Sequence, residues 1–316
     1  MASASRGSAP SVSGRILSAA AGLVGVLWAA ATVGFVLTRL APGDPVSVML
    51  GPQAIVSEPV KDSIRAELGL DRPVWTQYLD YLGQLARGDL GESYQLRLPV
   101  IEVIGRQAPA TLQLTALAIV IALILAVGTA ILARGRGRTI AALVELVVLS
   151  SPVFWIGLML LTVFAFGLGW FPVSGFGFAS LILPAATLAL PSAALISQVL
   201  RDGLETAGQQ PFIMTVRARG VGATRELSHH TLRHASVGAL TLAGFLLGSL
   251  LGGAVLVETV FGRAGLGQVA LAAITDRDLP VIAGLILLSA MVFAALGVII
   301  EFVVPLIDPR LRRGRL

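Results

Sequence analysis

The sequence predicts an all-α polytopic membrane protein whose chain crosses the lipid bilayer six times. Hydrophobic residues make up 55% of its 316 residues and charged residues only 13%, against roughly 25% charged residues in soluble domains. Uncharged runs long enough to span about 30 Å of hydrocarbon recur along the chain. Such runs must satisfy their own backbone hydrogen bonds, and the alternating pattern of a membrane barrel is absent, so the runs are predicted to be helices.

Six spans follow from these runs because turn-forming residues divide the longest one. The uncharged stretch 146–200 contains Gly167 and Pro172, which mark a turn between two spans. Pro184 and Pro191 are the positions at which the fourth span would break. The predicted spans cover residues 16–38, 109–133, 140–166, 180–200, 235–257 and 279–304.

The placement of arginine predicts the orientation of the chain. Arginines cluster in the segments that lie inside if the N-terminus is inside, whereas the short outer link between the third and fourth spans has none. The net charge of +5 is explained by this placement and does not indicate nucleic-acid binding. The predicted order is a cytoplasmic tail at 1–15, a first helix at 16–38, an extracytoplasmic insertion with short helices at 39–106, a membrane domain at 107–308 with an inner loop at 201–234, and a cytoplasmic tail at 309–316.

The N-terminal span has one alternative, a cleaved signal peptide. Arg15, an apolar stretch and the three alanines at 29–31 have that arrangement. The uncharged run continues to Thr38, beyond the apolar core of a usual signal peptide, and this favours a retained helix. A mature protein that begins at Thr32 would establish cleavage.

The chain lacks the motifs of the common catalytic and nucleotide-binding sites. No phosphate-binding loop of the Walker type, no HExxH, no GxSxG and no cysteine occurs in it. His230 and His234 have the spacing of two metal ligands on a helix, but only Glu226 lies nearby as a third ligand. We therefore predict a non-enzymatic protein without a metal or cofactor of its own.

Ionisable residues inside the spans lie near their ends. Glu145 and Glu258 are each within about two turns of a predicted interface, where snorkelling or pairing with a loop arginine is expected. Secondary transporters place such groups near the midplane, so their absence there indicates that transport would be driven from elsewhere. A stand-alone secondary transporter and a membrane scaffold or sensor remain alternatives.

The inner loop carries the most specific pattern of the sequence. Residues 211–220 read PFIMTVRARG and residues 229–235 read HHTLRHA. A short helix that lies flat at the membrane surface can transmit a push from a soluble motor. The glycine at its end permits the left-handed turn that terminates a helix.

Further motifs follow in order along the chain. They are LAPGDP at 40–45, LGLDRP at 68–73, GDLGES at 88–93, SPVFW at 151–155, VETVFGRAGLG at 257–267 and DPRLR at 308–312. Together with the inner loop they resemble the first permease subunit of the dipeptide/oligopeptide/nickel class of ABC importers over about residues 35–313. Ala264 stands where the family more often has proline, His234 where it more often has asparagine, and residues 214–216 where the wider superfamily has Glu-Ala-Ala.

The resemblance implies a type I ABC importer permease fold in the bacterial cytoplasmic (inner) membrane. It implies as partners a second homologous permease subunit, two ATPase subunits that bind ATP and Mg, and an extracytoplasmic solute-binding protein. The implied cargo is di- or oligopeptides, with nickel or a metal chelate as the alternative.

Two sets of site residues are predicted, the first of them mainly from the same resemblance. The predicted contact to the ATPase consists of Phe212, Thr215, Arg217, Ala218, Arg219 and Gly220. The predicted outer mouth of the translocation pathway consists of Glu258, Phe261, Gly262, Gly265 and Gly267, because the glycines allow the backbone to approach other backbone or cargo closely. A plain reverse turn between the fifth and sixth spans is the alternative. Asp44, Asp276 and Asp278 are expected either to attract a basic partner or to be solvated loop charges.

Overall fold

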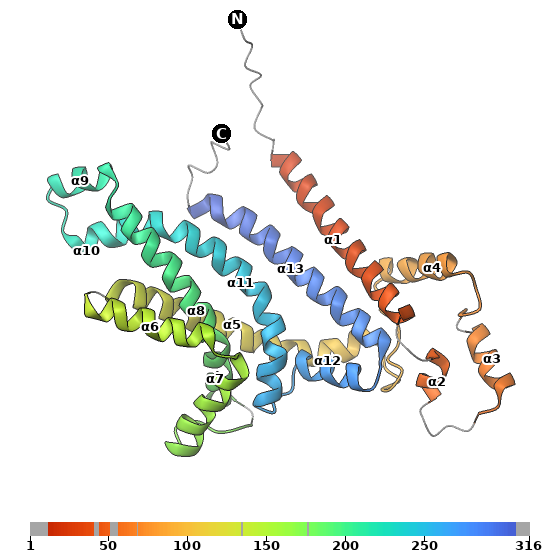
Figure 1. Cartoon of the computed structure of the whole chain (residues 1–316). Helices are drawn as coiled ribbons and strands as arrows, with labels where there is room; N and C mark the ends of the chain where they lie inside the picture. Colours follow the sequence, from red (N-terminus) through yellow and green to blue (C-terminus); the bar gives the residue numbers. More distant parts are fainter. Residues whose placement is uncertain are drawn as a thin grey trace, which may run out of the picture. The chain divides into compact units, whose positions relative to one another are not determined.

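The computed structural model describes residues 12–40, 44–50, 56–67, 69–133, 135–175 and 177–307. Across these ranges every regular element is a helix, as the apolar runs predict (Figure 1). The chain forms two compact units. The first unit comprises Met1–Leu23, Gln113–Arg263 and Phe293–Leu316, and the second comprises Val24–Leu112 and Ala264–Val292. The motif residues 41–43, 68 and 308–312, and the predicted tails apart from residues 12–15, lie outside the described residues.

Four described helices are individually long and apolar enough to cross a bilayer. They are Leu17–Leu40 of α1 (Val12–Leu40), α5 (Val100–Leu132), α8 (Ala179–Gly208) and Leu279–Ile299 of α13 (Leu279–Ile307). Two bent helix pairs bring the number to six if each pair is counted as one span. The predicted fold class of a six-span helical protein agrees with this architecture.

The predicted span 140–166 is bent and not one straight helix. α6 (Arg136–Ser150) is followed by α7 (Val153–Leu160) and the π-helical segment η1 (Leu161–Gly167), and the two parts meet at 112°. Pro152 explains the break, because proline lacks an N–H and disfavours the helical conformation in the residue before it. Ser151 is accordingly extended, with φ −94° and ψ 137°.

The fourth span does not break at its prolines. α8 continues through Pro184 and Pro191 as one helix of 30 residues, and it is the most buried of the four straight spans. Neighbouring helices and local adjustments allow proline inside a membrane helix. The fifth span, within α11 (Leu232–Val260), bends by 54° between Leu250 and Gly252, and consecutive glycines at 252 and 253 are a usual cause of such a kink.

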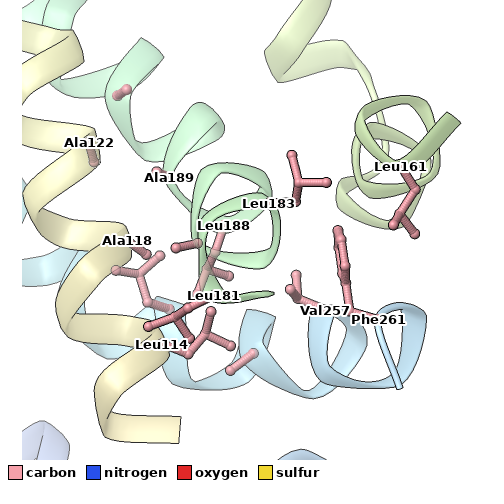
Figure 2. Packing of buried hydrophobic residues seen from close by; sticks show 14 of the residues in the cluster. Leu114, Ala118, Ala122, Leu161, Leu181, Leu183, Leu188, Ala189, Val257 and Phe261 are labelled. Carbon is pink, nitrogen blue, oxygen red and sulfur yellow. The ribbon is translucent and has the colours of Figure 1, made fainter. Parts of the chain in front are cut away.

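The core of the first unit is built where α5, η1, α8 and α11 converge (Figure 2). Leu114, Leu188 and Val257 are buried there with a set of alanines. Ala118 and Ala122 on α5, like the alanines on α8, let helix backbones approach closely, which is how helices associate in lipid. A second cluster of α5, α8 and α11 residues lies further toward the end of α8, and it includes Ala126, Ile196, Leu200, Ala235 and Ala239.

The second unit contains the predicted helical insertion. It holds α2 (Pro45–Leu50), α3 (Glu58–Glu67), α4 (Val74–Ala86) and α12 (Leu266–Thr275). The short amphipathic helix predicted around Trp75 is α4. It packs on α1 through aromatic contacts: the ring of Phe35 lies 5.2 Å from that of Tyr78 and 5.7 Å from that of Tyr81.

α5 begins earlier than the predicted second span, at Val100. Its 33 residues extend over about 50 Å at about 1.5 Å per residue, well beyond a hydrocarbon layer of about 30 Å. Its first turns can therefore lie outside the lipid, which explains why they carry the exposed ion pair between Glu102 and Arg106.

Asp278 is a structural carboxylate in the second unit. It is buried and accepts hydrogen bonds from the hydroxyl of Ser93 and, at 3.1 Å, from the backbone N–H of Tyr94. These bonds fasten the turn after GDLGES to the start of α13, so Asp278 is not a solvated loop charge. Asp44 is paired with Arg65 at 3.1 Å, whereas Asp276 is exposed.

Candidate functional site

The inner loop contains the predicted short helix. α8 continues to Gly208, beyond the predicted start of the loop, and α9 (Pro211–Ala218) follows after two residues (Figure 1). Pro211 occupies the first helical position, for which its fixed φ is suited. Gly220 has φ +75° and donates its N–H to the carbonyl of Arg217 at 2.9 Å. The predicted short helix ended by a glycine turn is thus confirmed.

One face of α9 is held by the rest of the first unit. Ile213 is fully buried and Val216 half-buried, which is expected of apolar residues three apart on a helix. Phe212 is half-buried, and its ring centroid lies 4.9 Å from that of His234 on α11. Phe212 therefore packs against α11 within the chain, and its side chain is not fully exposed for docking.

The other face of α9 is open to solvent. Five of the residues predicted to contact the ATPase are exposed: Thr215, Arg217, Ala218, Arg219 and Gly220. Met214, which the sequence pattern did not single out, is the most exposed large apolar side chain of the helix at 74%. The sequence signal for Met214 is the spacing of Ile213 and Val216. These two residues share the inward face of α9, so Met214 lies toward the outward side.

Arg217 is engaged within the chain. Its Nε lies 2.9 Å from Oε2 of Glu226 and its Nη2 lies 2.8 Å from Oε1, a bidentate ion pair. Glu226 is the first residue of the π-helical segment η2 (Glu226–Thr231), which follows α10 (Ala223–Arg225) and leads into α11. The hydrogen bonds to Glu226 raise the pKa of Arg217 above its ordinary value, so it stays charged.

A buried ion pair supports the end of α8 that leads to α9. Nη1 of Arg201 lies 2.6 Å from Oε1 of Glu145 on α6, and Nη2 makes a second bond to the same carboxylate. Ser197 accepts a further bond from Arg201 at 2.8 Å and is 2.7 Å from the hydroxyl of Thr129 on α5. The expected pairing of Glu145 with an arginine is confirmed, and it ties α5, α6 and α8 together.

α8 and α11 also approach closely beside the loop. A Cβ placed on Gly203 would lie 3.0 Å from Cα of Ala235, a contact so tight that the neighbouring backbone would have to move by a few tenths of an ångström. The two helices that enter and leave the α9 segment are therefore in contact at backbone level.

The predicted pathway mouth is divided between the two units. Glu258 and Phe261 are buried in the first unit, Phe261 within its main core. Gly262 is exposed, with φ +58°. Gly265 and Gly267 are buried at the start of α12 in the second unit.

Two cavities lie within the second unit. Gly265 borders one of about 320 Å³, together with the amides of Gln107 and Gln268 and the apolar side chain of Val269. A larger one of about 740 Å³ is lined by aromatic and charged side chains that include Phe35, Arg39, Tyr81, Arg87 and Tyr94. In the part of the chain that the structure describes, no three His, Asp or Glu side chains converge on a metal position.

Comparisons with known proteins match nearly the whole chain. The family model described as binding-protein-dependent transport system inner membrane component matches residues 118–313, and the model of its N-terminal region matches residues 14–115. A putative peptide transport system permease protein of Brucella abortus (strain 2308) is 34% identical over 310 residues, which cover 94% of this chain and 98% of that protein.

Two further matches differ in how similar they are to this chain. A di/tripeptide transport system permease protein of Pseudomonas aeruginosa (strain UCBPP-PA14) is 36% identical over 314 residues, covering 89% of this chain and 93% of that protein. The solved structure of an amino acid ABC transporter with histidines covers 66% of this chain and 94% of its own, with 18% identity and a TM-score of 0.48. That structural likeness is too weak to bear on the fold.

Proposed function

The chain belongs to the family of binding-protein-dependent transport system inner membrane components, and from this premise we propose that it forms half of the translocation pathway for di- and oligopeptides in an ATP-driven importer. It is a non-catalytic permease subunit, since this family supplies the membrane component of such systems. The relatives described above are named for peptide transport, which favours peptides over nickel or a metal chelate as cargo.

The proposed partners follow from the type of system. A binding protein and an ATPase belong to a binding-protein-dependent ABC importer. We propose two ATPase subunits, which bind ATP and Mg, and a second homologous permease subunit that completes the pathway. This chain carries no nucleotide-binding motif of the Walker type, which supports a separate motor.

The proposed location is the bacterial cytoplasmic membrane with both termini inside. The arginine clusters of the loop 201–234 and of the C-terminal tail support this orientation. In this orientation the insertion 39–106 faces the solute-binding protein, and α9 faces the ATPase. The segment 258–267 is then the outer mouth of the pathway, and the cavity beside Gly265 lies on that side.

The observation that carries the proposal is the exposed face of α9. An eight-residue helix presents Met214, Thr215 and Ala218 to solvent while Ile213 anchors it. The helices on either side are held by the buried Glu145–Arg201 pair and by backbone-level contact. A force applied to the exposed face is therefore passed to the membrane helices instead of being absorbed by the loop.

The test uses the transporter assembled from its subunits. Met214→Glu places a charge in the proposed apolar contact, and we expect co-purification of the ATPase and ATP-driven uptake of a labelled tripeptide to fall at least about tenfold. Val74→Glu is the matched control, because Val74 is exposed on α4 in the insertion, and we expect it to keep the ATPase bound. Unchanged assembly in Met214→Glu, or uptake by this chain alone under an ion gradient in liposomes, would contradict the proposal.

A further inference from the structure

We infer that Arg217 and Glu226 form an intramolecular latch that fixes the orientation of α9, so that Arg217 acts in coupling as a positioning residue and does not itself contact the ATPase. This inference rests on the proposed role of α9 as the coupling helix. It changes the role that the sequence pattern assigns to Arg217, and it gives Glu226 a role that the pattern does not.

The geometry of the pair is specific. Two adjacent nitrogens of the guanidinium face the two oxygens of one carboxylate, at 2.9 and 2.8 Å. This fork-on-fork arrangement fixes the direction as well as the distance of the contact. The side chain of Glu226 is 13% exposed, whereas that of Arg217 is 59% exposed. Arg217 therefore reaches inward to a carboxylate that the fold already holds in place.

α9 needs such a contact because of its length and connections. A helix of eight residues has little stability on its own. Ile213 anchors it at one point, and a helix anchored at one point can turn about that point. The Phe212–His234 contact and the Arg217–Glu226 pair add two more points, on α11 and on η2. Three separate points define the orientation of the exposed face.

The local structure around Glu226 also fits a positioning role. Glu226 begins the π-helical segment η2, which is inserted between α10 and α11. A π-helical turn holds one residue more than an α-helical turn and shifts the side chains before it. The turn at Gly220 separates α9 from α10 and η2, and across this turn Glu226 meets Arg217, nine residues away in sequence. In an uninterrupted helix, side chains nine residues apart would not meet.

Arg219 provides the comparison within the same loop. It is exposed, and no hydrogen-bond or ion-pair partner for its side chain is found among the described residues. Its guanidinium is available to an acidic partner, whereas two nitrogens of Arg217 are already used. The two arginines, two residues apart, should therefore respond differently to a change at Glu226.

The experiment uses charge reversal in the assembled transporter. The variants are Arg217→Glu, Glu226→Arg and the double variant that exchanges the two charges, with Arg219→Glu alone and combined with Glu226→Arg for comparison. Two quantities are measured in proteoliposomes: the ATPase retained on purification, and the labelled tripeptide taken up per ATP hydrolysed. Met214→Glu is run in parallel as the test of the docking face.

We expect each single change at Arg217 or Glu226 to leave ATPase retention within about twofold and to lower peptide uptake per ATP about fivefold. That factor corresponds to the loss of about 1 kcal/mol. The exchange of both charges should restore the uptake ratio to within about twofold of the original, which a general loss of folding would not do. Arg219→Glu should lower ATPase retention, and Glu226→Arg should not rescue it.

Two results would overturn the latch. If Glu226→Arg has no effect on uptake per ATP, or if the double exchange stays as low as Arg217→Glu alone, then Arg217 contacts the ATPase directly. If Met214→Glu still lowers ATPase retention in these cases, the proposed function stands and only the latch fails. If Met214→Glu also has no effect, the proposed role of α9 fails, and the latch fails with it.

Discussion

Removal of one member of the buried Glu145–Arg201 pair should destabilise the membrane domain strongly. The two side chains are only 7% and 11% exposed, so a charge left without its partner cannot be rehydrated. Breaking a buried pair from one side costs about 3–5 kcal/mol. Arg201 keeps its bond to Ser197 in Glu145→Ala, so we expect that variant to lose about 3 kcal/mol of stability, the lower end of this range.

The same reasoning predicts that removing both charges is far less harmful. Replacement of a buried pair by apolar side chains of similar volume is often close to neutral, because neither charge then has to be desolvated. Glu145→Leu combined with Arg201→Met should therefore be much closer to the original protein than either single change.

Thermal unfolding in detergent, followed by tryptophan fluorescence, measures these differences. At about 2–4 °C per kcal/mol, Glu145→Ala should lower the apparent Tm by about 6–12 °C and the double variant by less than about 3 °C. Arg138–Glu205 is the matched control, since it joins the same two helices but its side chains are 55% and 51% exposed. Glu205→Ala should cost at most about 1 kcal/mol.

The reasoning would be refuted by a double variant that is as unstable as the single ones. Such a result would mean that the shape of the two side chains, and not their charge balance, holds α6 against α8. A shift for Glu205→Ala as large as that for Glu145→Ala would equally show that burial does not set the cost.

Three further perturbations test other contacts. Both Gly203→Ala and Gly203→Leu place a Cβ 3.0 Å from Cα of Ala235 and should lower the apparent Tm. The further carbons of leucine add overpacking of about 1–3 kcal/mol or more, so Gly203→Leu should lower it far more, and equal shifts would contradict the close approach. Asp278→Asn removes a buried charged acceptor, worth about 1.5–3 kcal/mol, and should speed hydrogen exchange in the turn 93–97, so unchanged exchange would count against it. Partial burial alone would raise the pKa of Asp44, but the stronger combined effect of its bonds to Arg65 and a neighbouring serine lowers it. Its stabilising contribution is therefore complete above the unfolded-state pKa and lost as pH falls through the lower folded-state value. Protection of the amides of α2 and α3 from hydrogen exchange should thus fall below about pH 4, and Asp44→Asn should lack that fall.

The prolines illustrate how far the sequence predicts the course of the spans. Pro152, Pro184 and Pro191 all lie in uncharged stretches, and the two in the fourth span are the candidate places for a break. The break occurs at Pro152, with the chain bent by 112°, while α8 continues through both of the others. Sequence alone does not reveal which proline breaks a helix, because the neighbours that hold α8 straight come from distant segments.

In the inner loop, too, some features follow from neighbouring residues and others depend on contacts with another helix. A short helix closed by Gly220 was predicted from local patterns, because capping and turn conformation depend on neighbouring residues. Which side of that helix faces outward was not. Phe212 turned out to be half-buried on His234, and Met214 turned out to be exposed, because the contact that orients α9 is made by another helix.

Local chemistry therefore accounts for the number of spans, the positive loops and the position of α9, since transfer of a segment into lipid and termination of a helix depend on nearby residues. Contacts between remote residues required the packed chain. Glu145 and Arg201 are separated by 56 residues, and Ser93 and Asp278 by 185. Each pair meets because apolar faces pack two helices or turns together, and the sequence around either residue does not predict its distant partner.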